Sequence, residues 1–432
     1  MNLTENIISN FESKIDSFSG QYVQDLKKSA LEVFKTKGFP TIKNEDWKYT
    51  SLKSIIKIDY KLDTDINSVS KELVEQYATK VDSLKVVLVN GIFNEELSDV
   101  VSNDELEIAS LKDKLNNSPE QVETFLGKIA PSDNEMVALN NLSFNDGLFL
   151  KVKKNKIVEK TIQLLSFVTE EESFSRNRNL IVAEANSQVK IIEKQISLND
   201  SKTFANNLTE ISVGENSNYY HYRIQNDNDS ASLVDNTYVD QKRYSNTYID
   251  TFSFGGNITR NNLSIALSEE NAVANFNGIT LLTKNEQVDN HTYVDHLVPN
   301  CDSHELFKGI YDGSSKGVFR GKIFIHKDAQ NTNGNQQNSN LVLSEKAQIN
   351  AKPQLEIYAD DVKASHGCTI GQLDEEALFF LRSRGIPLKE AKALMMFAFA
   401  SEALENVKIE ELKEEINKII AAKLEVDLEF SE

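Results

Sequence analysis

The chain contains little cysteine and no long apolar run. Its 432 residues include two cysteines, Cys301 and Cys368, which cannot build a disulfide framework. The opening stretch, MNLTENIISNFESKID, lacks the basic start and the apolar core of a secretory signal. No apolar run approaches the roughly 18 residues of a membrane span. We therefore expect a soluble cytoplasmic protein with no membrane partner.

Positive charge is also scarce. Lysine and arginine total 47, against 66 aspartates and glutamates, which gives a formal net charge of −19. A surface of this charge repels phosphate-rich polymers, so nucleic acid is not expected as a partner. At about 150 residues per domain, the chain length allows two or three structural units.

Residues 1–146 are expected to form an N-terminal helical and mixed region. Between Leu3 and Gly38 the apolar residues recur at spacings of three and four, which places them on one face of a helix, and Gly38 is typical of a helix stop. The stretch that follows predicts three short elements: a buried strand at Val86–Leu88 and helical turns around Leu111 and Val122.

Residues 147–362 change to a period of two, as in LFLKVKK and GKIFIHKDAQ, with Asn, Ser, Asp and Gly between the runs. This pattern predicts a mainly β core of short strands joined by turns. Four polar corners resemble one another: AEANSQVKI, VGENSNYYH, LSEENAVANF and LSEKAQINA. The repetition favours a β-solenoid, because asparagine-rich corners can extend hydrogen bonding from coil to coil. An antiparallel sandwich is the alternative that the same alternation permits.

Residues 363–432 are expected to form a C-terminal helical domain that begins directly after Ser365. Asp374 can cap the first helix, and Gly385 can end it in a left-handed conformation. A third helix is expected to carry an apolar stripe that begins at Ile409.

The helix expected between these two, from Leu388 to about Leu404, contains the segment ALMMFAFA. This segment is apolar nearly all round, so it must pack on the solenoid or receive another protein. The flexible side chains of Met395 and Met396 suit an adaptable contact surface, and with Phe399 they are candidates for docking a partner. Packing in the core is the alternative for each of these residues.

Several histidines and one cysteine offer donor atoms for zinc or iron in the pattern H-x4-H-x4-C-x2-H, at His291, His296, Cys301 and His304. The spacing fits no standard closed site. In a strand, residues five apart point to opposite faces, so His291 and His296 are not expected to converge. His221 and His326 are interpreted as strand-surface or packing residues.

His366 and Cys368 are separated by a single glycine, Gly367. In an extended segment they share one face, and the glycine lets another backbone or a metal approach closely. Two ligands leave a metal site incomplete, so a partner would have to supply the rest. A hydrolase dyad with Cys368 as nucleophile and His366 as base is an alternative, although their adjacency makes its geometry awkward.

Two other classes of function are open from the residues alone. A carbohydrate-active enzyme on a β-helix needs paired carboxylates in a groove, and the candidates lie in Thr-Tyr-(Val or Ile)-Asp repeats at Asp240, Asp250 and Asp295. Their repetition is more typical of a structural role. A purely structural β-solenoid would normally be exported, and no export signal is present.

Four long segments resemble the SufB/SufD family of iron–sulfur cluster assembly subunits. They are NEDWKYTSL at Asn44, PNCDSHELFKGIYDG at Pro299, GVFRGKIFIHKDAQNTNGNQQNSN at Gly317 and TIGQLDEEALFFLRSRGI at Thr369. SufB members carry a Glu-His-Glu type sequence where this chain has Ser-His-Gly around His366. The resemblance therefore favours the SufD branch of the family.

The resemblance implies a right-handed parallel β-helix core between an N-terminal helical region and a C-terminal helical domain. It further implies a non-catalytic subunit whose core pairs with a SufB-like subunit and whose helices dock a SufC-like ATPase. His366 would contribute a metal ligand to a nascent iron–sulfur cluster, completed by ligands of the partner. No cofactor would be held stably by this chain alone: the cluster is transient, and ATP binds the ATPase partner. A homodimer in the absence of the SufB-like subunit stays open, and no role passes to Cys301 or Cys368.

Overall fold

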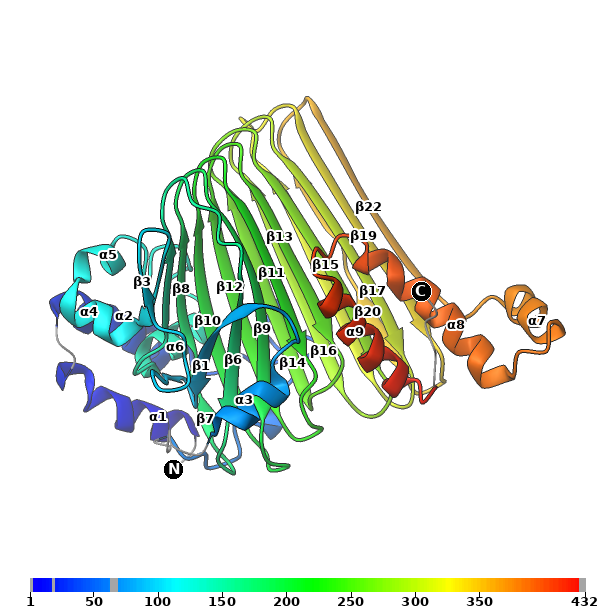
Figure 1. Ribbon diagram of the computed structural model, residues 1–432, viewed down its shortest axis with the longest axis horizontal. Coiled ribbons are helices and arrows are strands. Elements are labelled where there is room, and N and C mark those ends of the chain that lie inside the picture. The colour runs from blue at the N-terminus through cyan, green and yellow to red at the C-terminus, as the bar shows by residue number, and fades with distance from the viewer. Residues whose placement is uncertain (1–2, 18–19, 63–68, 427–432) are drawn as a thin grey trace.

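The computed structural model describes residues 3–17, 20–62 and 69–426. Parallel strands stack into a long solenoid, with helices near both ends of the chain (Figure 1). The strands form two sheets, and side chains from both sheets share one apolar interior. The expected mainly β fold with a parallel β-helix core and terminal helices is confirmed. No helix in the described ranges is long and apolar enough to cross a membrane.

The first sheet has ten strands, and all of its pairs are parallel except the small hairpin at its start. In spatial order they are β2 (Ile92–Phe93), β1 (Ser83–Val89), β6 (Thr161–Val168), β9 (Gln188–Ser197), β11 (Asn218–Gln225), β13 (Asn246–Ser253), β15 (Val273–Leu282), β17 (Asp302–Tyr311), β19 (Thr332–Val342) and β22 (Val362–Gly371).

The second sheet has twelve strands and faces the first. Its path runs β20 (Gln348–Ala351), β18 (Lys316–Ile325), β16 (Gln287–His296), β14 (Ile258–Leu267), β12 (Ser232–Gln241), β10 (Phe204–Val213), β8 (Arg178–Ala183), β5 (Leu148–Val152), β4 (Leu106–Ser110) and β3 (Val101–Ser102), with β21 (Gln354–Ile357) beside β18 and β7 (Phe174–Ser175) beside β10. Strands therefore precede residue 147 and continue beyond residue 362, on both sides of the segment with the clearest alternation.

The interior is apolar along one part of each coil and polar along another. In β11, Tyr219 belongs to the apolar cluster that runs through the solenoid. Arg223, on the same face of that strand, is buried and donates to the Thr251 hydroxyl at 2.7 Å and to the Asp235 carboxylate at 3.2 Å. A buried polar group is costly unless it is hydrogen-bonded, so these partners allow the strand to keep its alternation with charged residues inside.

Asparagine occupies the corners of successive coils in a left-handed backbone conformation. Asn186 and Asn216 both have φ of 56°. Asn216 Nδ2 donates to Asn186 Oδ1 at 2.8 Å, and Asn186 Nδ2 donates to Asn155 Oδ1 at 2.7 Å. Asparagine tolerates positive φ better than most residues. The expectation that the corners extend hydrogen bonding from coil to coil is confirmed for the corners at Asn186 and Asn216.

Most helices and irregular segments of the N-terminal region cover the twelve-stranded sheet, with apolar side chains packed on Phe204, Val234 and Ile258. The helical segments are α1 (Leu3–Glu12), η1 (Ile15–Ser17), α2 (Gln21–Lys37), η2 (Glu45–Trp47), η3 (Leu52–Ser54), α3 (Lys71–Tyr77), α4 (Leu111–Asn117), α5 (Pro119–Glu123) and α6 (Glu135–Ser143). The helix α3 packs instead on the ten-stranded sheet, where Val74 lies in one cluster with Val87 and Phe167. The expected strand at Val86–Leu88 lies in β1, and the turns around Leu111 and Val122 lie in α4 and α5, so all three are confirmed.

The expectation that the chain becomes helical directly after Ser365 is wrong. β22 runs to Gly371, because its backbone pairs in register with β19 over ten residues. Helices follow as α7 (Glu375–Ser383), α8 (Leu388–Ser401), η4 (Glu402–Leu404) and α9 (Glu410–Lys423). Asp374 caps α7, and Gly385 ends this turn with φ of 86°, as predicted.

The C-terminal helices differ in how far they are buried against the solenoid. α9, η4 and the later part of α8 pack on the outer face of the ten-stranded sheet, through a cluster that includes Phe252, Met396 and Ile416. α7 projects away from the solenoid (Figure 1) and buries no residue.

Replacing Asn186 should separate the two contributions of the corner asparagines. Asn186→Gly keeps the backbone conformation and loses two exposed hydrogen bonds, so we expect the free energy of unfolding to fall by about 1 kcal/mol. Asn186→Ala also places a Cβ in the left-handed region and should cost about 1 kcal/mol more. Equilibrium urea unfolding measures both, and equal losses would show that the backbone conformation carries no cost.

Candidate functional site

β22 forms one edge of the ten-stranded sheet. Among the described residues it pairs with β19 alone, so its other side has free backbone groups. His366 stands in register with Gln336 of β19, and Cys368 with Asn338. The two residues share one face of the strand, as predicted from their spacing. Both are exposed, because no further coil covers this end of the solenoid within the described ranges.

The shared face of His366 and Cys368 is the one that looks into the solenoid. Ala364, two residues earlier on the same face, packs against the apolar interior. Cys368 Sγ donates to Asn338 Oδ1 at 3.8 Å. Partial burial raises the pKa of the Cys368 thiol, which disfavours the thiolate needed for a nucleophile. No hydrogen bond joins His366 to Cys368 in the part of the chain that the structure describes, and the geometry gives the hydrolase dyad no support.

The four donor residues around Cys301 do not form a site. His291 and His296 point to opposite faces of β16, as predicted, and His304 is exposed on β17. His296 is buried, with Nε2 at 2.9 Å from the Ser303 hydroxyl, and burial lowers its pKa to about 4. Cys301 lies 3.5 Å from two backbone carbonyl oxygens. Over the described ranges, no group of three or more His, Cys, Asp or Glu could hold a metal ion.

The other two histidines have structural partners. His221 is fully buried, with Nε2 at 2.9 Å from a Glu193 carboxylate oxygen and Nδ1 at 3.1 Å from the Tyr219 hydroxyl. His326 Nε2 lies 2.8 Å from Asp295 Oδ1. The interpretation of His221 and His326 as strand-surface or packing residues agrees with these contacts, since His221 is buried and the His326 side chain is partly exposed.

The repeated aspartates do not share a groove. Asp240 pairs with Lys242 at 2.9 Å, and Asp295 pairs with His326. Asp250 lies in the other sheet, fully buried, and accepts a hydrogen bond of 2.7 Å from Asn277. Paired carboxylates for glycoside chemistry must flank one bond, and these three lie on separate elements with separate partners.

The tryptophan motif has a structural role that spacing alone could not reveal. The Arg260 guanidinium lies 3.9 Å from the centre of the Trp47 ring and 2.9 Å from Asp289 Oδ2. Although burial opposes ionisation, the charge of Arg260 lowers the pKa of Asp289 to about 2. The motif therefore fastens the N-terminal segment to the twelve-stranded sheet. A cavity of about 870 Å³ lies beside this contact, between residues 44–47 and the sheet.

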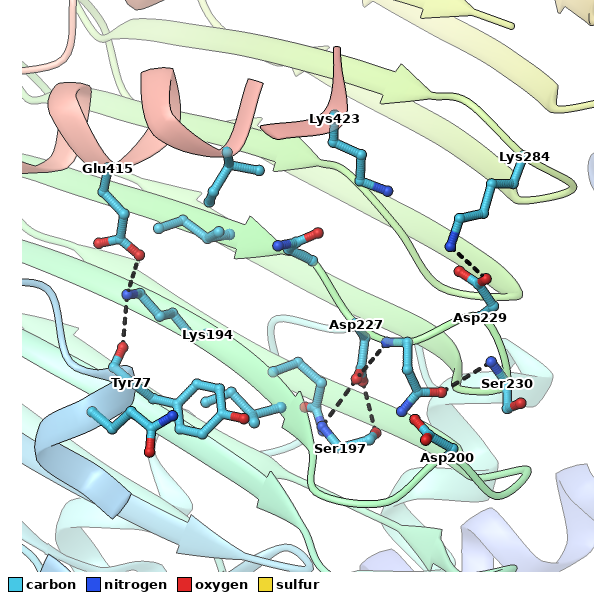
Figure 2. Close-up of a pocket in the computed structure, with 17 residues that line it drawn as sticks. Tyr77, Lys194, Ser197, Asp200, Asp227, Asp229, Ser230, Lys284, Glu415 and Lys423 are labelled. Carbon is cyan, nitrogen blue, oxygen red and sulfur yellow. Dashed lines mark hydrogen bonds and ion pairs between the residues drawn. The ribbon is translucent and has the colours of Figure 1, made fainter. Parts of the chain in front are cut away.

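A second cavity, of about 700 Å³, lies between α9 and the ten-stranded sheet (Figure 2). Lys194 of β9 donates to Glu415 of α9 at 2.6 Å and to the Tyr77 carbonyl at 2.8 Å. Lys284 pairs with Asp229 at 2.8 Å at the far side of the same cavity. The third lysine of the lining, Lys423 of α9, pairs with Glu286 at 3.0 Å. These ion pairs hold α9 on the sheet, and among the described residues they leave no unpaired lysine in the lining. The lining does not include His366.

Comparison with known proteins identifies the family. The sequence profile for "SUF system FeS cluster assembly, SufBD core domain" matches residues 166–399, and that for "SufBD protein N-terminal region" matches residues 2–164. The chain belongs to the SufBD family. It is therefore related to scaffold proteins of iron–sulfur cluster assembly, in agreement with the resemblance seen in the sequence.

Relatives within the SufBD family cover most of the chain. The iron–sulfur cluster assembly protein SufD of Escherichia coli is 30% identical over 393 residues, which is 90% of this chain and 90% of that protein. A SufBD family protein of Synechocystis is 29% identical over 410 residues, covering 92% of this chain and 90% of its own. SufD of Bacillus subtilis is 28% identical over 298 residues, with coverage of 68% and 67%.

The buried carboxyl of Asp250 should make stability depend on pH. Burial raises its pKa from 3.8 to about 7, so between these values the folded state holds a proton that the unfolded chain releases. This contribution to stability therefore falls as the pH rises. The free energy of unfolding of Asp250→Asn, taken relative to that of the parent, should therefore rise by roughly 2 kcal/mol between pH 5 and pH 8.

Urea unfolding at pH 5 and pH 8 measures this difference. The contributions of the other titrating groups to the free energy of unfolding cancel, because they are the same in variant and parent. Asp240→Asn is the control, because Asp240 is partly exposed and paired with Lys242. An Asp250→Asn difference that is the same at both pH values would contradict the assignment.

Proposed function

We propose that the chain is a SufD-type scaffold subunit that contributes His366 to a nascent iron–sulfur cluster at its junction with a SufB-like subunit. The observation that carries this proposal is the position of His366 on the unpaired edge strand β22, on the face that looks into the solenoid. The iron and sulfide are cargo, and the subunit itself hydrolyses nothing. The complex is expected to act in the reducing cytoplasm.

The edge of β22 supports pairing with another sheet. An exposed strand of ten residues presents a row of unpaired N–H and C=O groups, which proteins usually blunt with charge, proline or a short strand. β22 has one charged side chain, Lys363, and no proline. Exposed apolar side chains lie at the same end of the solenoid, at Ile370, Ile357 and Tyr358. A related β-helix can continue the sheet here by strand addition.

The donor set supports a shared cluster. His366 supplies an imidazole nitrogen, which suits iron, but one ligand cannot hold a cluster. Cys368 Sγ donates a hydrogen bond to Asn338 Oδ1, and no role as a second ligand is assigned to it. The remaining ligands, thiolates above all, must come from the neighbouring subunit. This chain alone would hold no cofactor stably.

We assign docking of a SufC-like ATPase to α7 and the start of α8. Phe379 is 74% exposed and Phe380 is 55% exposed, and Leu388 and Leu394 on α8 are also exposed. Monomeric surfaces seldom carry such a concentration of large apolar side chains without a partner. ATP-driven movement of the ATPase would then act on segment 363–432 and through it on the junction.

The residues named from the sequence for docking need revision. Met396 is buried against the sheet, and Met395 is half-buried. Phe399 packs beside that cluster with the Lys308 ammonium 4.5 Å from its ring centre. The sequence of an apolar helix does not show which of its sides is covered. The exposed aromatic pair at Phe379 and Phe380 therefore replaces these candidates.

Replacing His366 by alanine should lower cluster formation on the co-expressed complex by about tenfold or more, a typical loss when a metal site is perturbed. Assembly of the subunits should be unchanged, because the His366 side chain is exposed. Iron and acid-labile sulfide per purified complex give the measurement. Cys368→Ala, on the same strand and face, is the matched control and should keep the parent yield. A parent-like yield in His366→Ala would remove the site assignment.

A charge on α7 should weaken binding of the ATPase. Phe379→Asp should raise the Kd at least tenfold, which corresponds to about 1.4 kcal/mol, because aromatic anchors dominate interfaces. The variant should keep the parent unfolding midpoint, since the ring is exposed. Calorimetric titration of the chain with the ATPase measures the Kd. Tyr244→Asp, an exposed aromatic at a corner of the solenoid, is the control, and equal affinity for both variants would exclude α7.

A further inference from the structure

Gln336 lies directly behind His366 and is oriented by other residues. It stands in register with His366 of β22 on one side and with Glu305 of β17 on the other. In parallel sheets such in-register side chains lie on one face, about 4.8 Å apart. Gln336 Nε2 donates to Glu305 Oε1 at 3.0 Å. Gln336 is fully buried, so its amide cannot exchange this bond for water.

The surroundings of Glu305 and Gln336 allow one orientation of the amide. Thr292 donates its hydroxyl hydrogen to the second oxygen of Glu305. When the Glu305 carboxyl is ionised, both of its oxygens accept, so the Gln336 amide must present its NH₂ group to it. On the opposite sheet, Gly321 leaves the space that the amide fills: a Cβ there would lie 2.2 Å from Gln336 Nε2.

In this orientation, the amide oxygen of Gln336 points away from Glu305. Gln336 Oε1 is buried and has no hydrogen-bond partner among the described residues. The next side chain in its row is His366. Two nearby rows already contain hydrogen bonds between β19 and β22. On the outer face, Asn335 Nδ2 donates to the Ser365 hydroxyl at 2.8 Å. On the inner face, Cys368 Sγ donates to Asn338 Oδ1.

We propose that Gln336 is the positioning residue of His366: its amide oxygen accepts the N–H of one imidazole nitrogen and so leaves the lone pair of the other nitrogen free for iron. Histidines that ligate metals commonly donate their second nitrogen in this way, which fixes the tautomer and the ring orientation. Glu305, Thr292 and Gly321 act on His366 only through the orientation of the amide. This inference rests on the proposed role of His366.

The tautomer of His366 tests the proposal without a cluster. The full chain is labelled with ¹⁵N in its histidine rings, and the ring signals are recorded by NMR at pH 8. At this pH the Glu305 carboxyl, whose pKa burial raises to about 7, is ionised and accepts. The His366 signals are identified by their loss in His366→Ala. The parent should show a tautomer ratio displaced from that of free neutral histidine.

Gln336→Met removes the acceptor at similar volume and should return the His366 shifts to those of free neutral histidine. Gln337→Met, an exposed position on the opposite face of the same strand, is the matched control and should retain the displaced tautomer ratio of the parent. Gly321→Ala displaces the amide from the other sheet and is a second route to the same change. An unchanged tautomer ratio in Gln336→Met and Gly321→Ala would overturn the proposal.

Cluster yield on the co-expressed complex gives the second measurement. Gln336→Met should lower it by about tenfold, in the range usual for loss of an outer-shell partner. Suppose that Gln336→Met shifts the tautomer ratio, while the cluster yield stays parent-like in both Gln336→Met and His366→Ala. This result would refute the proposed function but support the hydrogen bond between Gln336 and His366. A low yield in His366→Ala with an unchanged tautomer in Gln336→Met would refute the positioning role alone.

Discussion

Hydrogen bonding between successive coils is the interaction on which the whole molecule depends. Each strand satisfies the backbone of the next in register, so residues at equal positions form rows along the solenoid. A row repeats one chemical environment many times, as in the corner asparagines, and it also fixes which side chains meet. The stack has to end, and its final strand, β22, is left with one unpaired side. The candidate site lies on this strand.

Local features of the fold were predictable from the sequence because their causes are local. The period of two in the apolar residues predicted the strands. The asparagines at the corners predicted the stacking of coils, since few other residues tolerate a positive φ. Asp374 and Gly385 gave the limits of α7 through capping chemistry. The opposite directions of His291 and His296, and the common face of His366 and Cys368, follow from strand geometry alone.

Features that depend on distant contacts were not predictable. The sequence ASHGCTIG has few strong strand formers, and it is extended because β19 pairs with it. Neither the ion pair between Lys194 and Glu415 nor the stacking of Arg260 on Trp47 leaves a pattern along the chain, since the partners are far apart in sequence. The spacing of His366 and Cys368 predicted that they share one face of a strand. Only the register of β22 on β19 shows that this face is directed toward the interior and that His366 aligns with Gln336.

The contact of Glu415 with Thr79, at 2.7 Å and across 336 positions of sequence, has a consequence for biosynthesis. The segment that covers the outer face of the ten-stranded sheet emerges from the ribosome after the strands that it covers. At roughly 5–20 residues per second, the interval between these two residues is about 20 to 70 seconds. During that time, strands of the ten-stranded sheet are synthesised before the helices that bury their outer apolar side chains.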